Sequence, residues 1–455
     1  MCSMKNIYAI IGLVSSSLNF SCSEFLDEKP DIKMVVPKSL TDVELLLNDY
    51  AAMNMGYPLL GEWATDDYYL TKQSWEAIAN QDQRNAYIWK DEPYEDAVQW
   101  QRPYKTVYIA NQVLEILSGL PKTGDPPTYQ RVYGAAHFFR AFAFHQLLEV
   151  YAPAYDSSTA GVELGIPLRL SPDIDGSVGR ANLSDSYGQV LSDYRIAISN
   201  LPGNEGRKGQ PHKAAAHAGL ARAYLYMGMF AEAYLHADSA IQLSPELMDY
   251  NKLKETDNFP VPRFNGEVLF PAMSTNAGPM GFTIALVDST LYASYAESDL
   301  RRTIFFRSNA APTGSYLYRG NYDRTSAQLF VGLTTSEIYL IKAEAAVRVG
   351  KSAEALLALN TLLKKRWELN SFVDIEEADA GRLLAIILQE RRKELLFRGR
   401  RWADLKRLNT EGAFQKTLVR KIGDQQYTLE PNSPKYAVRL PESVVRIGNL
   451  QQNKR

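Results

Sequence analysis

Cysteine is almost absent from this chain of 455 residues, which contains only Cys2 and Cys22. A protein that relies on disulfides in an oxidising compartment would carry more, so the fold must be stabilised by packing alone. A large excess of one charge is also lacking, because 50 basic and 52 acidic residues leave a net charge of −2, which gives no reason to expect nucleic acid as a partner. The apolar content of 45% is that of an ordinary globular protein rather than of a disordered or membrane-spanning one.

Motifs for catalysis and for cofactor binding are missing as well. The sequence has no H-E-x-x-H, no G-x-S-x-G, no phosphate loop and no dinucleotide fingerprint. Its five histidines lack metal-ligand spacing beyond chance. We therefore predict no catalytic residue, no bound metal and no cofactor.

The first 22 residues have the plan of a secretory signal. Lys5 precedes an apolar run, residues 7–18, that is too short to span a bilayer comfortably, and small residues lead up to Cys22. Bacterial lipoprotein signals more often carry leucine three residues before the cysteine, where this chain has Asn19. We predict that residues 1–21 are a lipoprotein signal peptide and that Cys22 is lipidated, with a non-lipidated signal cut nearby as the alternative. Two or more acyl chains would hold the protein durably to a membrane.

From Leu40 onward, amphipathic helices alternate with irregular stretches. Residues 217–245 fit the tetratricopeptide pattern closely, because Ala221 and Ala233 let two helices approach and Gly228 makes the turn between them. A looser copy runs over residues 339–366. The sequence therefore predicts an all-α scaffold of tetratricopeptide-like helix pairs in one domain, residues 22–455, with pairs at about 40–118, 129–200, 212–245 and 335–366.

The stretch 382–408 is predicted to be one further helix, with an apolar stripe at three- and four-residue steps. Charged residues fall on the same stripe, and charges drawn inward are tolerated only when they are paired and hydrogen-bonded. We therefore expect a partly buried network of carboxylates and guanidiniums that packs this helix against others. Gly399 within it indicates a close approach of two backbones. The apolar positions are Leu383, Ile387, Phe397 and Leu408, and the charged ones are Glu390, Glu394, Arg401 and Asp404.

Two pieces of the sequence carry a resemblance to a known family. ERRKELLFRGRRWADLKRL at 390–408 and LPESVVRIGNLQQN at 440–453 are similar to the paired signatures that close members of the RagB/SusD family. The opening CSEFLDE, the helix around Phe139 and the stretch SDLRRTIFF around Arg301 resemble the same family. The resemblance implies a lipoprotein on the outer face of the outer membrane that binds a nutrient, usually a glycan, beside a TonB-dependent transporter of the SusC type.

Candidate ligand residues lie in two loop-rich excursions between the helices, at about 56–94 and 251–330. Long irregular segments of a compact protein tend to be functional or disordered. Sugar binding needs aromatic faces for the pyranose ring next to carboxylates or amides for its hydroxyls, although most such rings could equally fill gaps between loops and helices. The candidates are Trp63, Asp66, Asp67, Tyr68, Tyr69, Trp75, Tyr292, Tyr295 and Tyr316.

The function that these observations favour is binding without chemistry: an outer-membrane, lipid-anchored surface protein captures an oligosaccharide or other nutrient and passes it to a SusC-like transporter. The first alternative is a tetratricopeptide-type scaffold on the periplasmic face that binds proteins. The second is a lipid-anchored glycoside hydrolase that uses Asp66 or Asp67, which are neighbours in sequence and therefore more often point apart.

Overall fold

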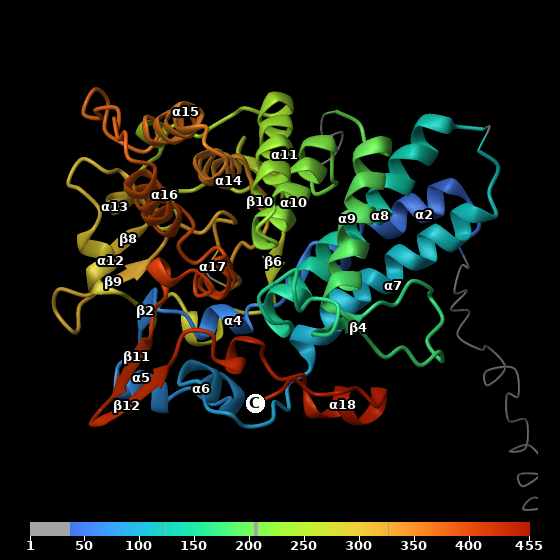
Figure 1. The fold of residues 1–455 in the computed structure, drawn as a ribbon, viewed down its shortest axis with the longest axis horizontal. Coiled ribbons are helices and arrows are strands. Elements are labelled where there is room, and N and C mark those ends of the chain that lie inside the picture. The colour runs from blue at the N-terminus through green and yellow to red at the C-terminus, as the bar shows by residue number, and fades with distance from the viewer. Residues whose placement is uncertain (1–36, 123, 204–207, 326) are drawn as a thin grey trace, which may run out of the picture. The chain divides into compact units, whose positions relative to one another are not determined.

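The computed structural model describes residues 37–122, 124–203, 208–325 and 327–455, of which Ser39–Arg455 belong to one unit by their contacts. Helices dominate this unit and its strands are short (Figure 1), so the predicted all-α scaffold of helix pairs is confirmed. The predicted signal peptide and Cys22 lie outside the described residues. Within the described ranges, no helix combines the length and the apolar character that a membrane span needs.

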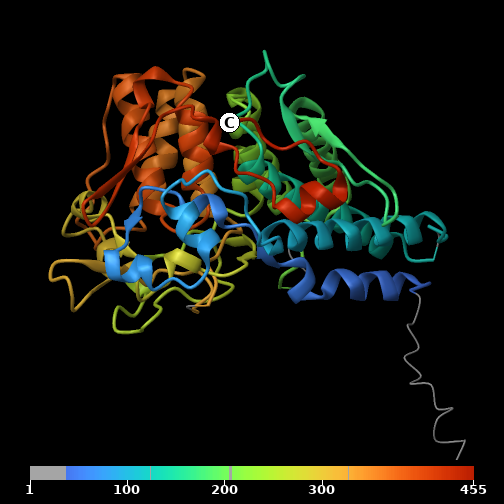
Figure 2. The same cartoon turned by 90° about the horizontal axis from the view of Figure 1, so that it is seen from below.

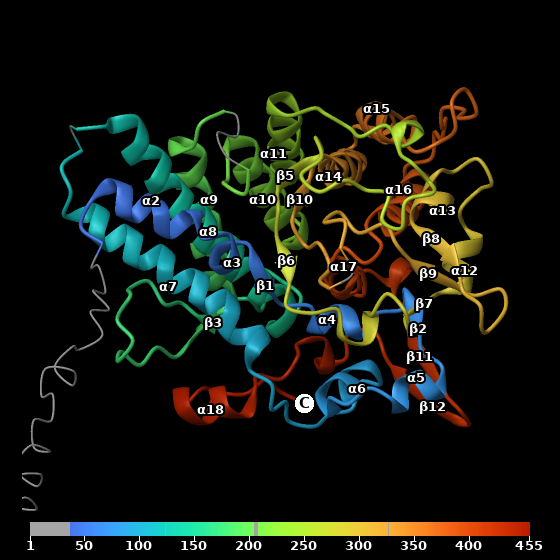
Figure 3. The same cartoon turned by 180° about the vertical axis from the view of Figure 1, so that it is seen from behind.

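Four helices form one end of the unit (Figures 1 and 3): α2 (Leu40–Asn48), α7 (Val98–Ser118), α8 (Pro126–Tyr151) and α9 (Leu183–Asn200). The start of α2 is a capping box, in which Ser39 Oγ accepts from the Asp42 amide and the Asp42 carboxylate accepts from the Ser39 amide. Asp125 caps α8, and two prolines occupy its first turn, where a missing N–H has no cost. Local sequence therefore fixes where α2 and α8 begin.

The two tetratricopeptide-like pairs stack on each other in the middle of the unit. They are α10 (Lys213–Tyr226) with α11 (Phe230–Leu243), and α14 (Thr335–Arg348) with α15 (Ser352–Leu363), with α11 packed on α14. Ala221 and Ala233 are fully buried where α10 and α11 meet. Gly228 adopts a φ of +72° in the turn, a conformation that side chains disfavour. The small residues and the glycine therefore have the roles that the repeat pattern assigns to them.

The prediction of one helix over 382–408 is wrong. The chain forms α16 (Ala380–Glu394) and α17 (Arg401–Leu408), joined by a turn in which Phe397 and Gly399 have φ values of +58° and +72°. A helix cannot pass through two left-handed residues, so the axis changes direction here. A side chain on Gly399 would meet Val331 at 2.8 Å, so the expected close approach is also present.

The predicted network of buried charges is confirmed on both helices. On α16, Glu394 accepts from Arg366 at 2.9 Å, and Arg391 donates to Asp404 of α17 at 2.8 Å. Arg407 of α17 binds Glu344 of α14 through both terminal nitrogens. Each of these side chains is buried and paired, so the charges join α14, α16 and α17 without leaving an isolated buried ion.

The two loop excursions contain short strands that were not predicted from the sequence. The first excursion holds β1 (Met55–Tyr57) and β2 (Tyr68–Tyr69), and the second holds β6 (Met273–Ser274) and β7 (Leu286–Val287). Two further strands of the second excursion, β8 (Phe306–Ser308) and β9 (Tyr316–Tyr318), complete a four-stranded sheet of order β2-β7-β9-β8, and β1 pairs in parallel with β6. The excursions are therefore joined by backbone hydrogen bonds.

The remaining elements are small and flank these layers. They comprise the strands β3 (Leu164–Pro167), β4 (Arg180–Asn182), β5 (Val268–Phe270), β10 (Leu333–Thr334), β11 (Leu418–Ile422) and β12 (Gln425–Leu429), and the helices α3 (Tyr50–Met53), α4 (Leu60–Trp63), α5 (Lys72–Glu76), α6 (Gln81–Tyr87), α12 (Ser289–Ala293), α13 (Arg301–Ile304) and α18 (Glu442–Gly448). Single 3₁₀ turns are η2 (Tyr250–Lys252), η3 (Gly278–Met280), η4 (Gly412–Phe414) and η5 (Pro434–Tyr436).

Candidate functional site

The pair Asp66 and Asp67 anchors the first excursion to the signature helices α16 and α17. Asp66 accepts from Arg401 Nε at 2.7 Å and from Lys416 Nζ at 2.7 Å. Asp67 accepts from Arg392 Nε at 2.7 Å. Both carboxylates are thus paired with cations of the protein itself. Through these pairs, the two signature helices bind the loop that follows α4.

The charges around this pair argue against a role of Asp66 as a general acid. Burial alone would raise its pKa, but the guanidiniums of Arg401 and Arg392 outweigh burial and hold the pKa well below its usual range. Burial raises the pKa of Asp67, which is only 1% exposed and lies against Arg392. A general acid must carry a proton and reach the substrate, and neither side chain combines the two. Among the described residues, no cluster of three or more His, Cys, Asp or Glu could hold a metal ion.

Three of the predicted ligand rings are buried in the unit. Trp63 Nε1 donates to the Ala277 carbonyl at 3.1 Å, and Tyr68 donates to the Trp63 carbonyl at 2.7 Å. Tyr295 donates to the Lys393 carbonyl at 2.8 Å. These rings are at most 3% exposed, so in this structure they position the loops against the scaffold, and Tyr68 also contributes to the lining of a pocket beside the β11–β12 hairpin.

The other predicted rings reach the surface. Tyr69, at the edge of the four-stranded sheet, is 36% exposed. Trp75 on α5 is half-buried and donates from Nε1 to the Arg84 carbonyl at 3.2 Å. Tyr292 and Tyr316 stack with centroids 3.5 Å apart, beside Arg302, whose Nε donates to the Tyr292 hydroxyl at 3.2 Å. The four-stranded sheet contains both β2, which carries Tyr69, and β9, which carries Tyr316 of the stack, although more than 200 residues separate them in the chain.

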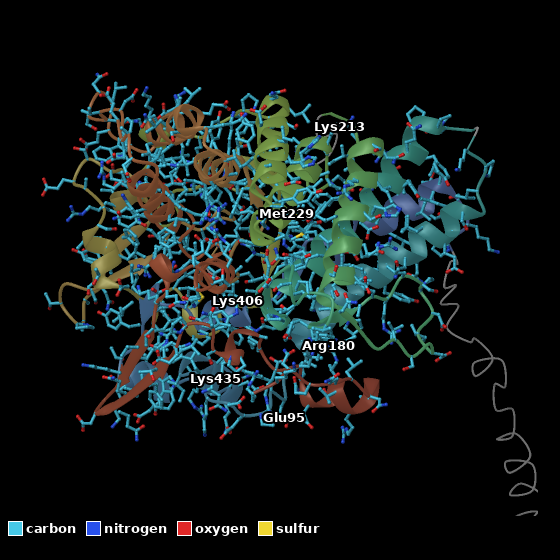
Figure 4. All side chains as sticks on the ribbon, viewed as in Figure 1. Glu95, Arg180, Lys213, Met229, Lys406 and Lys435 are labelled. Carbon is cyan, nitrogen blue, oxygen red and sulfur yellow. The ribbon has the colours of Figure 1, made fainter. Side chains whose placement is uncertain are left out.

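Two pockets flank the hairpin of β11 and β12. Figures 1 and 3 show this hairpin next to α5 and α6. The first pocket has a volume of about 500 Å³ and the second about 640 Å³, and Trp89 lines both. The first is lined mainly by Asp66, Tyr69, Asp288, Thr290, Arg392, Lys416, Val419, Arg420 and Lys421. The second is lined mainly by Trp75, Gln81, Arg84, Asn85, Lys90, Asp91, Gln426, Tyr427, Thr428 and Lys435, the last of which is labelled in Figure 4.

The hairpin that separates the pockets was missed in the sequence. A turn signal is present at Gly423 and Asp424, between the runs 418–422 and 425–429, but 418–422 does not alternate apolar and polar residues, since Val419 is exposed and Arg420 is buried. Gly423 has a φ of +58°, as such a turn requires. Figure 2, seen from below, shows this C-terminal segment running beside the first excursion. The hairpin therefore adds a third chain segment to the candidate site.

Comparison with known proteins gives two family models that match the chain. One is described as "Starch-binding associating with outer membrane" and covers residues 24–225; the other is described as "SusD family" and covers residues 319–441. A curated relative, SusD-like protein P2 from Formosa agariphila, is 23% identical, with 78% of this chain and 79% of that protein covered.

Solved structures agree with these matches in fold. A SusD superfamily protein from Bacteroides thetaiotaomicron is 22% identical with a TM-score of 0.75, covering 92% of this chain and 100% of that one. Surface glycan-binding protein A from Bacteroides fluxus is 17% identical with a TM-score of 0.68, covering 92% and 99%. Fold and surface define a helix-pair scaffold whose loops and C-terminal hairpin line two pockets. The chain belongs to the SusD family, as residues 390–408 and 440–453 predicted.

Proposed function

We propose that this protein is a surface lipoprotein that captures a nutrient, in the first place an oligosaccharide, and delivers it to a TonB-dependent transporter of the SusC type. The observation that carries the proposal is an aromatic ring of the first excursion that reaches the surface at each of the two pockets beside the hairpin. Tyr69 lines one pocket and Trp75 the other, among hydroxyl, amide and charged side chains. Aromatic faces bind pyranose rings, and such polar groups bind their hydroxyls.

The mechanism that we propose needs no reaction step. Asp66 and Asp67 are bound to Arg401 and Arg392, so they hold the loop that carries Tyr69 instead of attacking a ligand. The two rings can then bind a sugar with little reordering, which lowers the entropic cost of association. Tethering near a transporter mouth raises the effective ligand concentration there, so modest affinity suffices.

Membrane attachment through Cys22 is part of the proposal. The matched family model carries a description that associates it with the outer membrane, and that match begins two residues after the cysteine. The acyl chains would supply the affinity for the membrane, at about 0.8 kcal/mol for each buried methylene. We expect a Cys22→Ala variant to leave the outer-membrane fraction, and continued sedimentation with that fraction would refute the anchor.

Tyr69 gives the sharpest test of ligand binding. We expect the full chain to bind oligosaccharides of a glycan panel without cleaving them, and Tyr69→Ala to lower affinity by about fivefold to thirtyfold through loss of stacking. Tyr108→Ala on α7 is the matched control, because Tyr108 is also 36% exposed and lies in the scaffold. Equal losses in both variants would refute the site, and release of reducing sugar would favour the hydrolase.

A specific observation favours protein binding as a second function. Leu235 on α11 and Leu357 on α15 are 61% and 68% exposed, on the stacked helix pairs. Stacked helix repeats form extended surfaces that bind proteins. Such a surface suits the transporter in our proposal, and it equally suits a periplasmic scaffold. Protease treatment of intact cells separates the two, since a periplasmic protein would be protected.

A further inference from the structure

Both pockets beside the hairpin carry more positive than negative charge, in a chain whose net charge is −2. Four cations line the first pocket, namely Arg392, Lys416, Arg420 and Lys421, against the carboxylates of Asp66 and Asp288. Three line the second pocket, namely Arg84, Lys90 and Lys435, against Asp91 alone. A recess lined by one sign of charge raises the local concentration of ligands of the other sign.

The carboxylates of the first pocket already have partners. Asp66 is shared by Arg401 and Lys416, so more than one positive charge surrounds it. Asp288 caps α12, where its carboxylate accepts from the Leu291 amide at 2.8 Å. These acids therefore repel an anionic ligand less than two free carboxylates would.

Arg420 adds a positive charge that the protein does not neutralise with a carboxylate. Its side chain is buried, stacks on Tyr87 at 3.6 Å from the ring centroid, and donates only to the backbone carbonyls of Trp63, Thr65 and Tyr68 among the described residues. An arginine guanidinium carries its positive charge in proteins. In this partly desolvated position its field acts over a longer range than that of an exposed lysine.

The exposed face of the hairpin connects the two pockets. Lys421 of β11 lies opposite Gln426 of β12, and Val419 opposite Thr428. All four residues are exposed, and the β11 pair lines the first pocket while the β12 pair lines the second. Side chains directly opposite each other in an antiparallel pair share a face. One ligand could therefore cross the hairpin with Tyr69 near one end and Trp75 near the other.

We infer that the ligand of this surface is an acidic oligosaccharide that lies across the β11–β12 hairpin. Its sugar rings stack on Tyr69 and Trp75, and its carboxylate or sulfate groups bind Lys416 and Lys421. The inference rests on the proposed function, and it adds the ligand's charge and its path over the surface. Uronic acids and sulfated sugars would both supply the required anion, so the experiment has one arm for each.

The test compares charged and neutral forms of the same sugar chain on the full protein. One arm uses oligogalacturonate and its methyl ester, and the other uses carrageenan oligosaccharides before and after desulfation. We expect at least one charged form to bind about tenfold more tightly than its neutral counterpart, with an affinity that falls as sodium chloride rises. The arm that shows this preference identifies the anion.

Matched lysine variants locate the contact. We expect Lys416→Gln and Lys421→Gln each to lower affinity for the charged form by about fivefold or more, and to lower affinity for neutral forms by less. Lys351→Gln is the control, because Lys351 and Lys416 are both ion-paired lysines with 46% of the side chain exposed. Equal affinity for charged and neutral forms, or charged binding that both variants leave intact, would overturn the inference while the proposed function stands. Failure of every oligosaccharide to bind would overturn both.

Discussion

Charged residues are arranged in opposite ways in the scaffold and at the loop end. In the scaffold, buried guanidiniums that join helices meet carboxylates in pairs such as Arg222 with Glu337 and Arg407 with Glu344. Around the hairpin, cations outnumber carboxylates in both pockets. Unpaired charge is costly inside a protein but useful on a surface that meets an anion. Paired opposite charges therefore characterise the part of the protein that holds the fold. An excess of cations characterises the part that we expect to bind the ligand.

The largest effect should come from breaking a balanced pair. Arg222→Ala leaves Glu337 buried without the partner that it binds at 2.5 Å, on side chains that are 1% exposed. We expect the free energy of unfolding to fall by about 3–5 kcal/mol, measured by chemical denaturation. Arg382→Ala is the control, because its pair with Glu377 is at the surface and its side chain is 71% exposed. Similar losses in the two variants would contradict the contrast.

Glu62 is a buried carboxyl that departs from this pairing of opposite charges. Its Oε1 accepts from the Trp402 amide at 2.8 Å, and Oε2 has no hydrogen-bond partner within the part of the chain that the structure describes. Burial raises its pKa to about 8, so the folded state retains a proton that the unfolded state releases near the ordinary value. Stability should therefore fall as pH rises from about 4.5 to about 8, by at most about 1.4 kcal/mol per pH unit.

The variant Glu62→Gln tests this dependence. It keeps the oxygen that accepts from Trp402 and cannot ionise, so its stability should exceed that of the native chain increasingly from pH 5 to pH 8. Thermal unfolding at several pH values measures the difference. Glu76→Gln, at a surface position where the side chain is 55% exposed, should change it little. Parallel curves for the native chain and Glu62→Gln would show that the folded state keeps no extra proton.

Asp66→Asn should have a smaller effect on stability, since Asp66 lies at the boundary between the two regions with 14% of its side chain exposed. We expect a loss of about 1–2 kcal/mol and faster proteolysis within the first excursion, because Arg401 and Lys416 lose their charged acceptor. Asp374→Asn, whose ion pair with Lys364 is exposed, is the control. An unchanged proteolysis rate would show that the loop is held by other contacts.

Trp75→Ala should have the smallest effect on the fold. The ring is half-buried and donates one hydrogen bond, to Arg84. We expect stability to change by about 1 kcal/mol or less, whereas affinity falls severalfold for oligosaccharides long enough to cross the hairpin and stays unchanged for disaccharides. Isothermal titration with sugars of increasing length measures this, and equal losses at every length would place the whole ligand in one pocket.

The sequence predicted the helix pairs because their signals are local. Ala221, Gly228 and Ala233 lie within 13 residues and report one turn and one close contact. It did not predict the break between α16 and α17, since Phe397 continues the apolar stripe and its φ of +58° is imposed by tertiary packing.

The candidate site was predicted only in part, for a similar reason. Composition selected loops that contribute to the lining of the pockets, but it could not separate Trp63, which bonds to Ala277 across more than 200 residues, from Tyr69, which faces solvent. Whether a side chain is buried depends on which distant segment packs over it, and the local sequence at 63–69 does not indicate that residue 277 packs there. The role of Asp66 was missed for the same cause, because Arg401 and Lys416 lie more than 300 positions away.

The turn at Gly399 has a consequence for how this fold can diversify. Arg392 of α16 binds Asp67 and Arg401 of α17 binds Asp66, whereas Arg407 of α17 binds Glu344 of the scaffold. The two helices that meet at this turn therefore hold the scaffold on one side and the loop after α4 on the other. We expect a foreign loop that supplies an acidic pair after α4 to be held by the same arginines, so that this loop can be exchanged without redesigning the scaffold.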